Sequence, residues 1–350
     1  MEAWLLREWQ RNSPWQMLLR PFSWVFALLA HARRSLFRLG ILKSERVGVA
    51  VIVVGNITVG GTGKTPVVLA VAQLLARSGK RCGIISRGYS RVDADDQMRR
   101  SIGTVIHVVP ESTESGVTSD EALLLATRSG VPVYTSADRA AAARSLLRDH
   151  PEVDVLVSDD GLQHYGLSRD LEICVIDGAR GFGNGALLPA GPLRESLTRL
   201  DNVDAIVVNG QAAPGLLNAG YAAPVFSMDL GNESLVRVRD GKMMAIEQGL
   251  AEFSEKKIHA VAGTGSPARF FTHLERLGFK MEKTRAFPDH HPYKAADFTG
   301  SEAGIVLMTE KDAVKCKAFA DDRMWFMRVD AILPDTFGEF LVKRLSELKK

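Results

Sequence analysis

The stretch "VIVVGNITVGGTGKTPVVLA", residues 51–70, passes from an apolar run into glycines and then into Lys-Thr-Pro. The β-branched residues at its start favour a strand. The glycines expose backbone amides in a loop, and the residues after them read as a helix that begins. A loop between a strand and a helix N-terminus is a site for an anion. The stretch therefore predicts an α/β fold with an anionic ligand at this loop.

Within it, "TVGGTGKT", residues 58–65, matches the phosphate-binding pattern GxxxxGK[ST] in its last three positions. Thr58 replaces the first glycine of the pattern, and Gly60 and Gly61 supply the flexibility instead. Lys64 is expected to reach the β- and γ-phosphates, and the Thr65 hydroxyl to bind Mg²⁺. The alternative is an ordinary glycine turn. The predicted nucleotide-binding residues of this loop are Thr58, Val59, Gly60, Gly61, Thr62, Gly63, Lys64 and Thr65.

Two adjacent acids, Asp159 and Asp160, follow the apolar run in "DVLVSDDG". Such a pair repels unless a cation lies nearby, so it is a candidate Mg²⁺ site beside the phosphate loop. Asp160 and Gly161 could also form only a turn, and the sequence does not say which acid touches the metal directly.

The "TEKD" element at 309–312 has the wrong order for guanine recognition, which favours ATP. The signature lysine of membrane-targeting ATPases is missing from this loop.

Continuous apolar runs alternate with helical patterns from residue 47 onward. This alternation predicts a P-loop NTPase-like, mainly parallel sheet flanked by helices. Near residue 210 a stretch rich in Gly, Ala and Pro indicates a connection to a second, smaller α/β segment. We therefore expect three parts: an N-terminal segment 1–46, a kinase core 47–210 and a subdomain 211–350 that closes a cleft. Three widely spaced cysteines exclude a disulfide scaffold and fit a reducing compartment.

The N-terminal segment differs in composition from the rest of the chain. Residues 1–46 contain eight Lys and Arg against three acids, and four of the five tryptophans. Their apolar run, 21–30, is half of the roughly 20 residues that a membrane span needs. Tryptophan favours the headgroup region and arginine pairs with anionic lipid. We expect residues 1–40 to form helices in or on a membrane surface; the alternative is a helical hairpin packed on the protein's own core.

Four short stretches are unusual for purely structural segments. "SRGYSR", 86–91, ends a strand, and "SDEALLLA", 119–126, begins a helix in which Asp120 could be only a capping acid. "GPLRES", 191–196, follows a proline turn. "FPDHHPY", 287–293, contains His290 in a loop, where most histidines are structural.

Together, these stretches closely resemble one family, tetraacyldisaccharide 4′-kinase, the lipid A 4′-kinase of Gram-negative bacteria. Nearly the whole chain is covered by its ordered motifs: "GNITVGGTGKTP", "SRGY", "DEA", "DDGLQH", "PLRE", "FPDHH" and "TEKDAVK". Ser119 and Leu162 stand where the family often has Gly and Phe, and neither change removes a functional group. The basic, Trp-rich N-terminus is similar to that family's membrane-docking segment.

The resemblance implies ATP-dependent phosphorylation of a lipid disaccharide 1-phosphate at its 4′-hydroxyl, with ATP and Mg²⁺ as cofactors and lipid IVA as product. It implies that Asp120 is the catalytic aspartate, that His290 pairs with it, and that Asp159 and Asp160 surround the metal. A carboxylate–imidazole pair is a sensible base for a sugar hydroxyl. The other motif positions that the resemblance assigns to the active site are Arg87, Tyr89, Arg139, Gln163, Arg194 and Glu195, the last near the metal.

We therefore expect a monomeric kinase, peripheral on the cytoplasmic face of the bacterial inner membrane, that binds anionic lipid and no nucleic acid. A P-loop kinase for a soluble metabolite is one alternative. The other is a nucleotide-switched membrane-binding protein without transfer chemistry.

Overall fold

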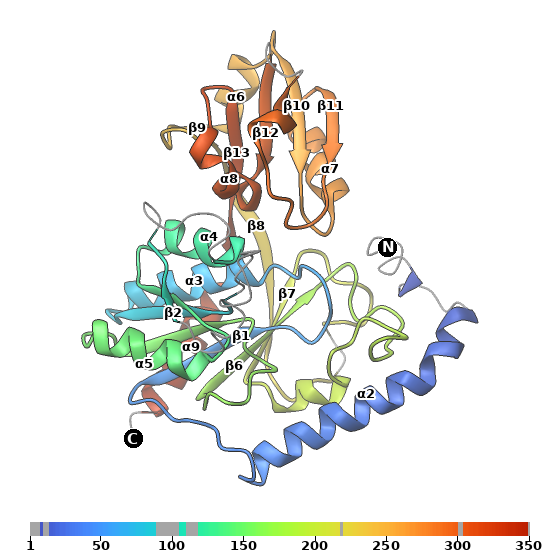
Figure 1. Cartoon of the computed structure of the whole chain (residues 1–350), viewed down its shortest axis with the longest axis vertical. Helices are drawn as coiled ribbons and strands as arrows, with labels where there is room; N and C mark the ends of the chain where they lie inside the picture. The colour runs from blue at the N-terminus through green and yellow to red at the C-terminus, as the bar shows by residue number, and fades with distance from the viewer. Residues whose placement is uncertain are drawn as a thin grey trace, which may run out of the picture.

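The computed structural model describes residues 8–9, 14–88, 105–109, 118–217, 220–299 and 304–348. Two lobes are joined by two long strands, β8 and β13 (Figure 1). The larger lobe contains the phosphate loop, and the smaller lobe carries the second α/β segment. The predicted residue Tyr89 lies outside the described ranges.

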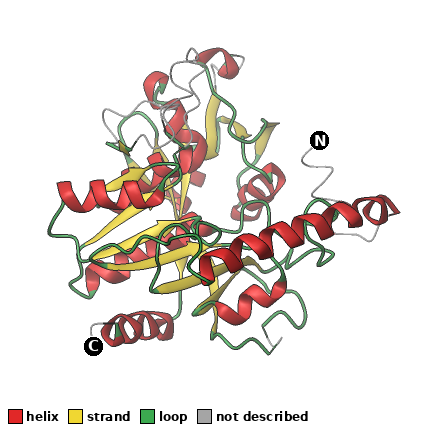
Figure 2. Ribbon diagram, turned by 60° about the horizontal axis from the view of Figure 1, so that its bottom comes forward, coloured by secondary structure: helices red, strands yellow, loops and turns green. Residues whose placement is uncertain are grey.

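A mainly parallel sheet forms the centre of the larger lobe, in the order β8-β7-β6-β1-β5-β2-β4-β3. Among the described strands of this lobe, only the short pair β3 and β4 is antiparallel. The apolar runs form these strands because they are covered by helices on both faces (Figure 2). Its strands are β1 (Ala50–Gly55), β2 (Cys82–Ser86), β3 (Ile106–His107), β4 (Val133–Thr135), β5 (Val155–Asp159), β6 (Leu171–Asp177) and β7 (Ala205–Asn209).

Four helices cover this sheet: α3 (Lys64–Arg77), α4 (Asp120–Ser129), α5 (Arg139–Asp149) and α9 (Asp335–Glu347). One apolar cluster joins α3, α4 and α9 to one face of the sheet, and a second cluster joins α5 to the other. Because Phe337 and Leu341 of α9 are buried against the larger lobe, this helix does not pack with the smaller segment to which the sequence analysis assigned it.

The smaller lobe continues the strand order as β11-β10-β12-β13-β8, with β9 paired to β8. β8 (Val225–Arg237) is parallel to β7 at its start and antiparallel to β13 (Met324–Ile332) further on, so it belongs to both sheets. The other elements are β9 (Met243–Ala245), α6 (Ile246–Glu252), β10 (Lys257–Ala262), α7 (Pro267–Leu277), β11 (Met281–Ala286), η3 (Ala295–Phe298), β12 (Gly304–Thr309), α8 (Glu310–Cys316) and η4 (Lys317–Phe319).

Helix α2 (Pro14–Arg38) lies along the outside of the larger lobe (Figure 1). Its buried residues are polar: Ser23 accepts a hydrogen bond from the amide of Ala190 and donates one to the carbonyl of Leu187. Most of its large apolar residues are exposed, although Phe37 contacts the Tyr165 ring at 5.8 Å between centroids. The predicted alternative of a hairpin packed on the core is therefore wrong for the described helix. Among the described residues, no helix is long and apolar enough to cross a membrane.

Candidate active site

The phosphate loop lies between β1 and α3, at the carboxyl edge of the parallel sheet. Gly60 and Gly63 have φ angles of 98° and 90°, a conformation that favours glycine. A Cβ at Gly63 would lie 2.4 Å from Nδ2 of Asn209, which donates a hydrogen bond to the carbonyl of Thr62. Glycine is therefore required at position 63. α3 begins directly after it at Lys64, and the first amides of such a helix have no partner within the helix and can bind an anion.

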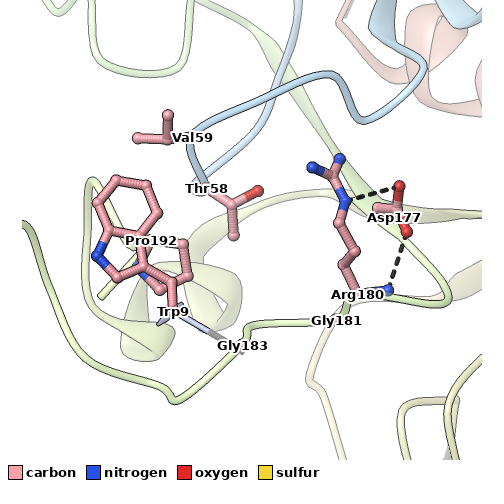
Figure 3. A pocket seen from close by; sticks show the side chains of 8 residues that line it. All are labelled: Trp9, Thr58, Val59, Asp177, Arg180, Gly181, Gly183 and Pro192. Carbon is pink, nitrogen blue, oxygen red and sulfur yellow. Dashed lines mark hydrogen bonds and ion pairs between the residues drawn. The ribbon is translucent and has the colours of Figure 1, made fainter. Parts of the chain in front are cut away.

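Neighbouring segments hold the loop in shape. Asn56 donates to the Thr62 hydroxyl over 3.2 Å, and the amide of Val59 donates to the carbonyl of Pro192 over 2.8 Å. Figure 3 shows Trp9 and Pro192 beside Thr58. The cavity between them measures about 10 Å³, room for one water at most. Trp9 thus links the N-terminal segment to the base of the phosphate loop.

The two adjacent acids face the loop lysine. Nζ of Lys64 lies 3.4 Å from Oδ1 of Asp160, and Nη1 of Arg194 lies 3.5 Å from its Oδ2. Burial raises the pKa of Asp160, but these two cations outweigh it and hold the pKa below its usual value. Burial and the neighbouring Asp160 raise the pKa of Asp159 to about 6, although Ser86 donates a hydrogen bond to this carboxylate. The neighbouring cations thus stabilise the charged form of Asp160 but do not offset the burial of Asp159.

Three further predicted residues lie around the acidic pair and the phosphate loop. Arg139, buried at the start of α5, donates to the carbonyls of Asp159 and Asp160 over 2.7 and 3.3 Å, so it fixes the backbone of the acidic pair. Gln163 donates to Glu195 over 2.8 Å and to the carbonyl of Asn56 over 2.9 Å. Arg87 lies exposed after β2.

Glu195 is buried among side chains that already engage both of its carboxylate oxygens. Tyr165 donates to Oε2 over 2.5 Å, Gln163 donates to Oε1, and Nε of Arg199 lies 3.5 Å from Oε2. Through Gln163 this carboxylate supports the segment around Asn56. Its predicted role near the metal therefore stays a prediction.

The contact of Asp120 with His290 joins the two lobes. Oδ2 of Asp120, at the start of α4, lies 2.9 Å from Nδ1 of His290, in the loop after β11. Ser119 is the residue that caps α4, because its hydroxyl accepts a hydrogen bond from the amide of Ala122. Asp120 is therefore not needed as a cap. His290 has a φ of 61°, which is unusual for a residue with a side chain and is typical of functional sites.

Two lysines of α8 surround this pair. Nζ of Lys311 lies 2.6 Å from Glu121 and 3.1 Å from Asp289, and Nζ of Lys315 lies 3.6 Å from Oδ2 of Asp120. Burial raises the pKa of Asp120, but the hydrogen bond with His290 and the charge of Lys315 outweigh it, so the pKa is lowered. The hydrogen bond with Asp120 raises the pKa of His290. At neutral pH, Asp120 is a carboxylate that can accept a proton.

A second contact joins the lobes near the phosphate loop. Nη1 of Arg269, in α7, lies 2.5 Å from Oδ2 of Asp177 at the end of β6. Arg180 binds the same carboxylate, as Figure 3 shows, and donates to the carbonyl of Gly61. Ionic contacts thus join the two lobes at both of these points.

Sequence reasoning missed several of these residues. Lys311 and Lys315 lie four positions apart in "TEKDAVK", a spacing that looks like a solvated helix face. Asp177 and Arg269 stand in no motif. The order of "TEKDAVK" within the family resemblance was the one signal that could have pointed to the lysines.

Comparisons with known proteins match this chain over nearly its full length. The family model "Tetraacyldisaccharide-1-P 4'-kinase" matches residues 15–346. Tetraacyldisaccharide 4′-kinase from Methylobacillus flagellatus is 47% identical over 345 residues, 99% of this chain and 96% of the relative. The enzyme of that name from Dechloromonas aromatica is 44% identical over 348 residues, 99% of this chain and 98% of the relative.

A solved structure is similar over nearly the whole length. The crystal structure of "apo" form LpxK from Aquifex aeolicus in complex with ATP has a TM-score of 0.77 and 29% identity, covering 94% of this chain and 99% of that chain. The predicted family resemblance, the mainly parallel α/β fold and the kinase activity are thereby confirmed. The chain that carries this phosphate loop, acidic pair and Asp120–His290 contact belongs to the tetraacyldisaccharide-1-P 4′-kinase family.

Proposed function

We propose that this protein transfers the γ-phosphate of ATP to the 4′-hydroxyl of a tetraacyldisaccharide 1-phosphate, forming lipid IVA. The observation that carries the proposal is the Asp120–His290 pair, 2.9 Å apart and contributed by the two lobes. A base at the start of α4 and a phosphate loop at the start of α3 belong to neighbouring helices of one cluster. Phosphoryl transfer needs these two parts, a phosphate cradle and a group that orients the acceptor.

On the nucleotide side, Lys64 and the first amides of α3 would bind the β- and γ-phosphates of ATP. The complex of the Aquifex aeolicus protein with ATP supports this assignment. Lys64 contacts Asp160 at 3.4 Å, and Arg194 lies on the opposite oxygen of the same carboxylate. Both cations are therefore positioned to neutralise charge that develops on the transferred phosphate.

The residues around the acidic pair fit Mg²⁺. Oδ1 of Asp159 is buried and accepts no hydrogen bond from the described residues, and buried Oδ1 of Asp160 has only the ion-pair contact with Lys64 at 3.4 Å. Hard carboxylate oxygens of this kind suit Mg²⁺, which also retains waters and phosphate oxygens as ligands. Thr65, Asp159 and Asp160 would hold the ion. When bound, Mg²⁺ supplies charge neutralisation to the phosphates.

On the acceptor side, Asp120 orients and deprotonates the hydroxyl. His290 contacts Oδ2 of Asp120. Oδ1 has no hydrogen-bond partner among the described residues and is not among their fully buried atoms, so a substrate can reach it. The acceptor proton passes to this oxygen as the hydroxyl oxygen bonds to the γ-phosphorus. The bond from that phosphorus to the bridging oxygen breaks and ADP leaves.

The substrate remains in a bilayer, and α2 supports docking there. Eight of its apolar side chains are more than half exposed on the outer side of the helix. Large exposed apolar surfaces of this kind mark interaction sites. The eight exposed side chains of α2 are Trp15, Met17, Leu18, Phe22, Trp24, Val25, Leu28 and Leu29.

Arg33 of the same helix donates a hydrogen bond to the carbonyl of Gln163, which ties the docking helix to the active-site motif. We therefore place the protein on the cytoplasmic face of the inner membrane, where ATP is available. One chain contributes all the described groups of the candidate site, which supports the proposal that it acts as a monomer.

The test is transfer of labelled phosphate from ATP to the lipid acceptor in vesicles. Asp120→Asn should lose transfer, and Asp335→Asn should keep it, since Asp335 is also the first residue of a helix but is exposed and remote from the site. Transfer to a soluble sugar but not to the lipid would favour a metabolite kinase. ATP hydrolysis with no transfer to either acceptor would favour a nucleotide-switched membrane protein.

A further inference from the structure

Lys315 is a buried cation for which the mechanism above has no role. Its side chain is 3% exposed, and an ammonium group loses several kcal/mol of hydration when it is buried. Its Nζ lies 2.9 Å from Oδ1 of Asp312 and 3.6 Å from Oδ2 of Asp120, and 4.9 Å from the centre of the Tyr293 ring. The chain thus places this charge between two carboxylates and over an aromatic face.

Asp312 is the fixed partner of this lysine. It is fully buried, and its Oδ2 accepts hydrogen bonds from the amide of Gly263 over 2.9 Å and from the hydroxyl of Thr309 over 2.6 Å. These bonds join α8 to the end of β10, so Asp312 cannot follow Lys315 if the lysine moves. Lys315 is therefore held from the smaller lobe and reaches toward Asp120 of the larger lobe.

The other charged groups near Asp120 are paired among themselves. Lys311 contacts Glu121 at 2.6 Å and Asp289 at 3.1 Å, and its Nζ lies 3.4 Å from Nε2 of His290. The charge of Lys311 is thus shared with two further carboxylates. Among the described residues, Lys315 and His290 are the groups that contact the Asp120 carboxylate itself.

Both of these groups lie on the same oxygen. His290 and Lys315 approach Oδ2 of Asp120 at 2.9 and 3.6 Å. One hydrogen bond from His290 and one ion-pair contact from Lys315 on the same oxygen restrict how this carboxylate can rotate, and they leave its second oxygen open. The arrangement resembles the general requirement that a catalytic base be oriented by a third group.

We propose that Lys315 is a positioning residue that holds Oδ2 of Asp120 together with His290 and keeps Oδ1 directed at the acceptor hydroxyl. The inference rests on the proposed function, in which Oδ1 takes the hydroxyl proton. Lys315 itself exchanges no proton in the step. Its second effect is electrostatic: a cation at this distance favours the ionised form of the base.

The test compares Lys315→Met, which removes the charge and keeps an unbranched chain, with Lys317→Met, which removes an exposed lysine two positions later. With wild-type chain as reference, kcat and KM for ATP are measured on the lipid acceptor across pH. We expect Lys315→Met to lower kcat about 10- to 100-fold with KM for ATP unchanged. The acid limb of its kcat profile should move about one pH unit or more upward, because Asp120 loses a neighbouring cation.

Other results overturn the inference. If Lys315→Met matches Lys317→Met in kcat and in the position of the acid limb, Lys315 does not position the base. A lower kcat with an unmoved acid limb would mean that Lys315 only joins α8 to α4. Where Lys315→Met does not fold, Lys315→Gln replaces it under the same criteria.

The proposed function is judged separately, from the wild-type chain. An active wild type with a normal Lys315→Met overturns only the role of Lys315. A wild type that folds and binds ATP but transfers no phosphate to the lipid overturns the proposed function, and with it the role of Lys315.

Discussion

Nδ1 of His290 lies 2.9 Å from Oδ2 of Asp120, although 170 positions separate the two residues in the chain. Asp120 begins a helix of the larger lobe, and His290 lies in a loop of the smaller lobe. The pair therefore forms only when the lobes come together. This couples the arrangement of the lobes to the presence of an oriented base.

The first prediction concerns this pair as a unit. Asp120→Ala should lower kcat about 10²- to 10⁴-fold, because a positioned base is lost, while KM for ATP stays close to that of the wild type. The double variant with His290→Ala should be scarcely slower than the slower single variant, since residues that act together are non-additive. A kinetic double-mutant cycle on the lipid acceptor measures this, and additive losses would assign the two residues independent roles.

The second prediction concerns the phosphate loop. Lys64→Ala should abolish detectable transfer, because the cation that neutralises the β- and γ-phosphates is gone. The fold should persist, since the side chain packs no core cluster. Circular dichroism checks folding, and Lys343→Ala on the exposed face of α9 is the control. Normal turnover by a folded Lys64→Ala protein would exclude the assigned role of the loop.

The third prediction is a pH dependence of stability. The pKa of His290 is raised by its hydrogen bond with Asp120, so the folded protein binds this proton more tightly than the unfolded chain. The resulting stabilisation is complete below the ordinary histidine pKa of about 6.5 and is lost as the pH rises through the raised value. His290→Asn should therefore lower the free energy of unfolding more at pH 6 than at pH 9. Denaturant titrations at both values measure it, and an equal loss at both would contradict the pairing.

The fourth prediction concerns a buried ionic contact between the lobes. Arg128 of α4 is 5% exposed; its Nη1 lies 2.6 Å from Glu310, and its Nη2 contacts Asp330. Arg128→Met should lower the free energy of unfolding by about 3–5 kcal/mol, because two acids lose their shared cation. Arg148→Met is the matched control, since Arg148 forms an exposed pair with Asp149. A loss no larger than that of the control would mean that water already screens this contact.

The strands of the larger lobe could be predicted from sequence because they are short, continuous apolar runs. "VDVLVSDD" and "LEICVID" lie close to β5 and β6. β8 is not marked by such a run. Its sequence, "VFSMDLGNESLVR", mixes exposed and buried positions and includes Gly231 and Asn232, where the register with β13 shifts. A strand shared by two sheets has no single buried face, so no simple periodicity marks it.

The candidate site was predictable only in part, for a similar reason. Motif spacing indicates Lys64 and the acidic pair, because one loop and one neighbouring strand carry them. The pairing of Asp120 with His290 came from the family resemblance, since no local pattern links residues from two lobes. Lys315 was not predicted, because burial of a helix lysine depends on which lobe packs against it.

The last prediction concerns α2 and the membrane. Trp24 and Leu28 are 70% and 68% exposed on the side of the helix that faces away from the protein. Trp24→Asp with Leu28→Asp should release the protein from vesicles that contain anionic lipid, because two apolar contacts are replaced by charges repelled by the surface. Val342→Asp with Leu348→Asp places equal charge on exposed apolar positions, one in α9 and one directly after it, and should leave binding unchanged.

Vesicle co-sedimentation measures this binding, and KM for the lipid acceptor should rise in the α2 variant while ATP binding stays intact. High salt should weaken wild-type binding only in part. Salt screens the charge of the arginines, but it does not weaken the insertion of the tryptophans into the bilayer. If the α2 variant sediments with vesicles as well as the α9 variant does, the docking surface lies elsewhere on the chain. If it loses binding but keeps a normal KM for the lipid, α2 anchors the protein without presenting the substrate to Asp120.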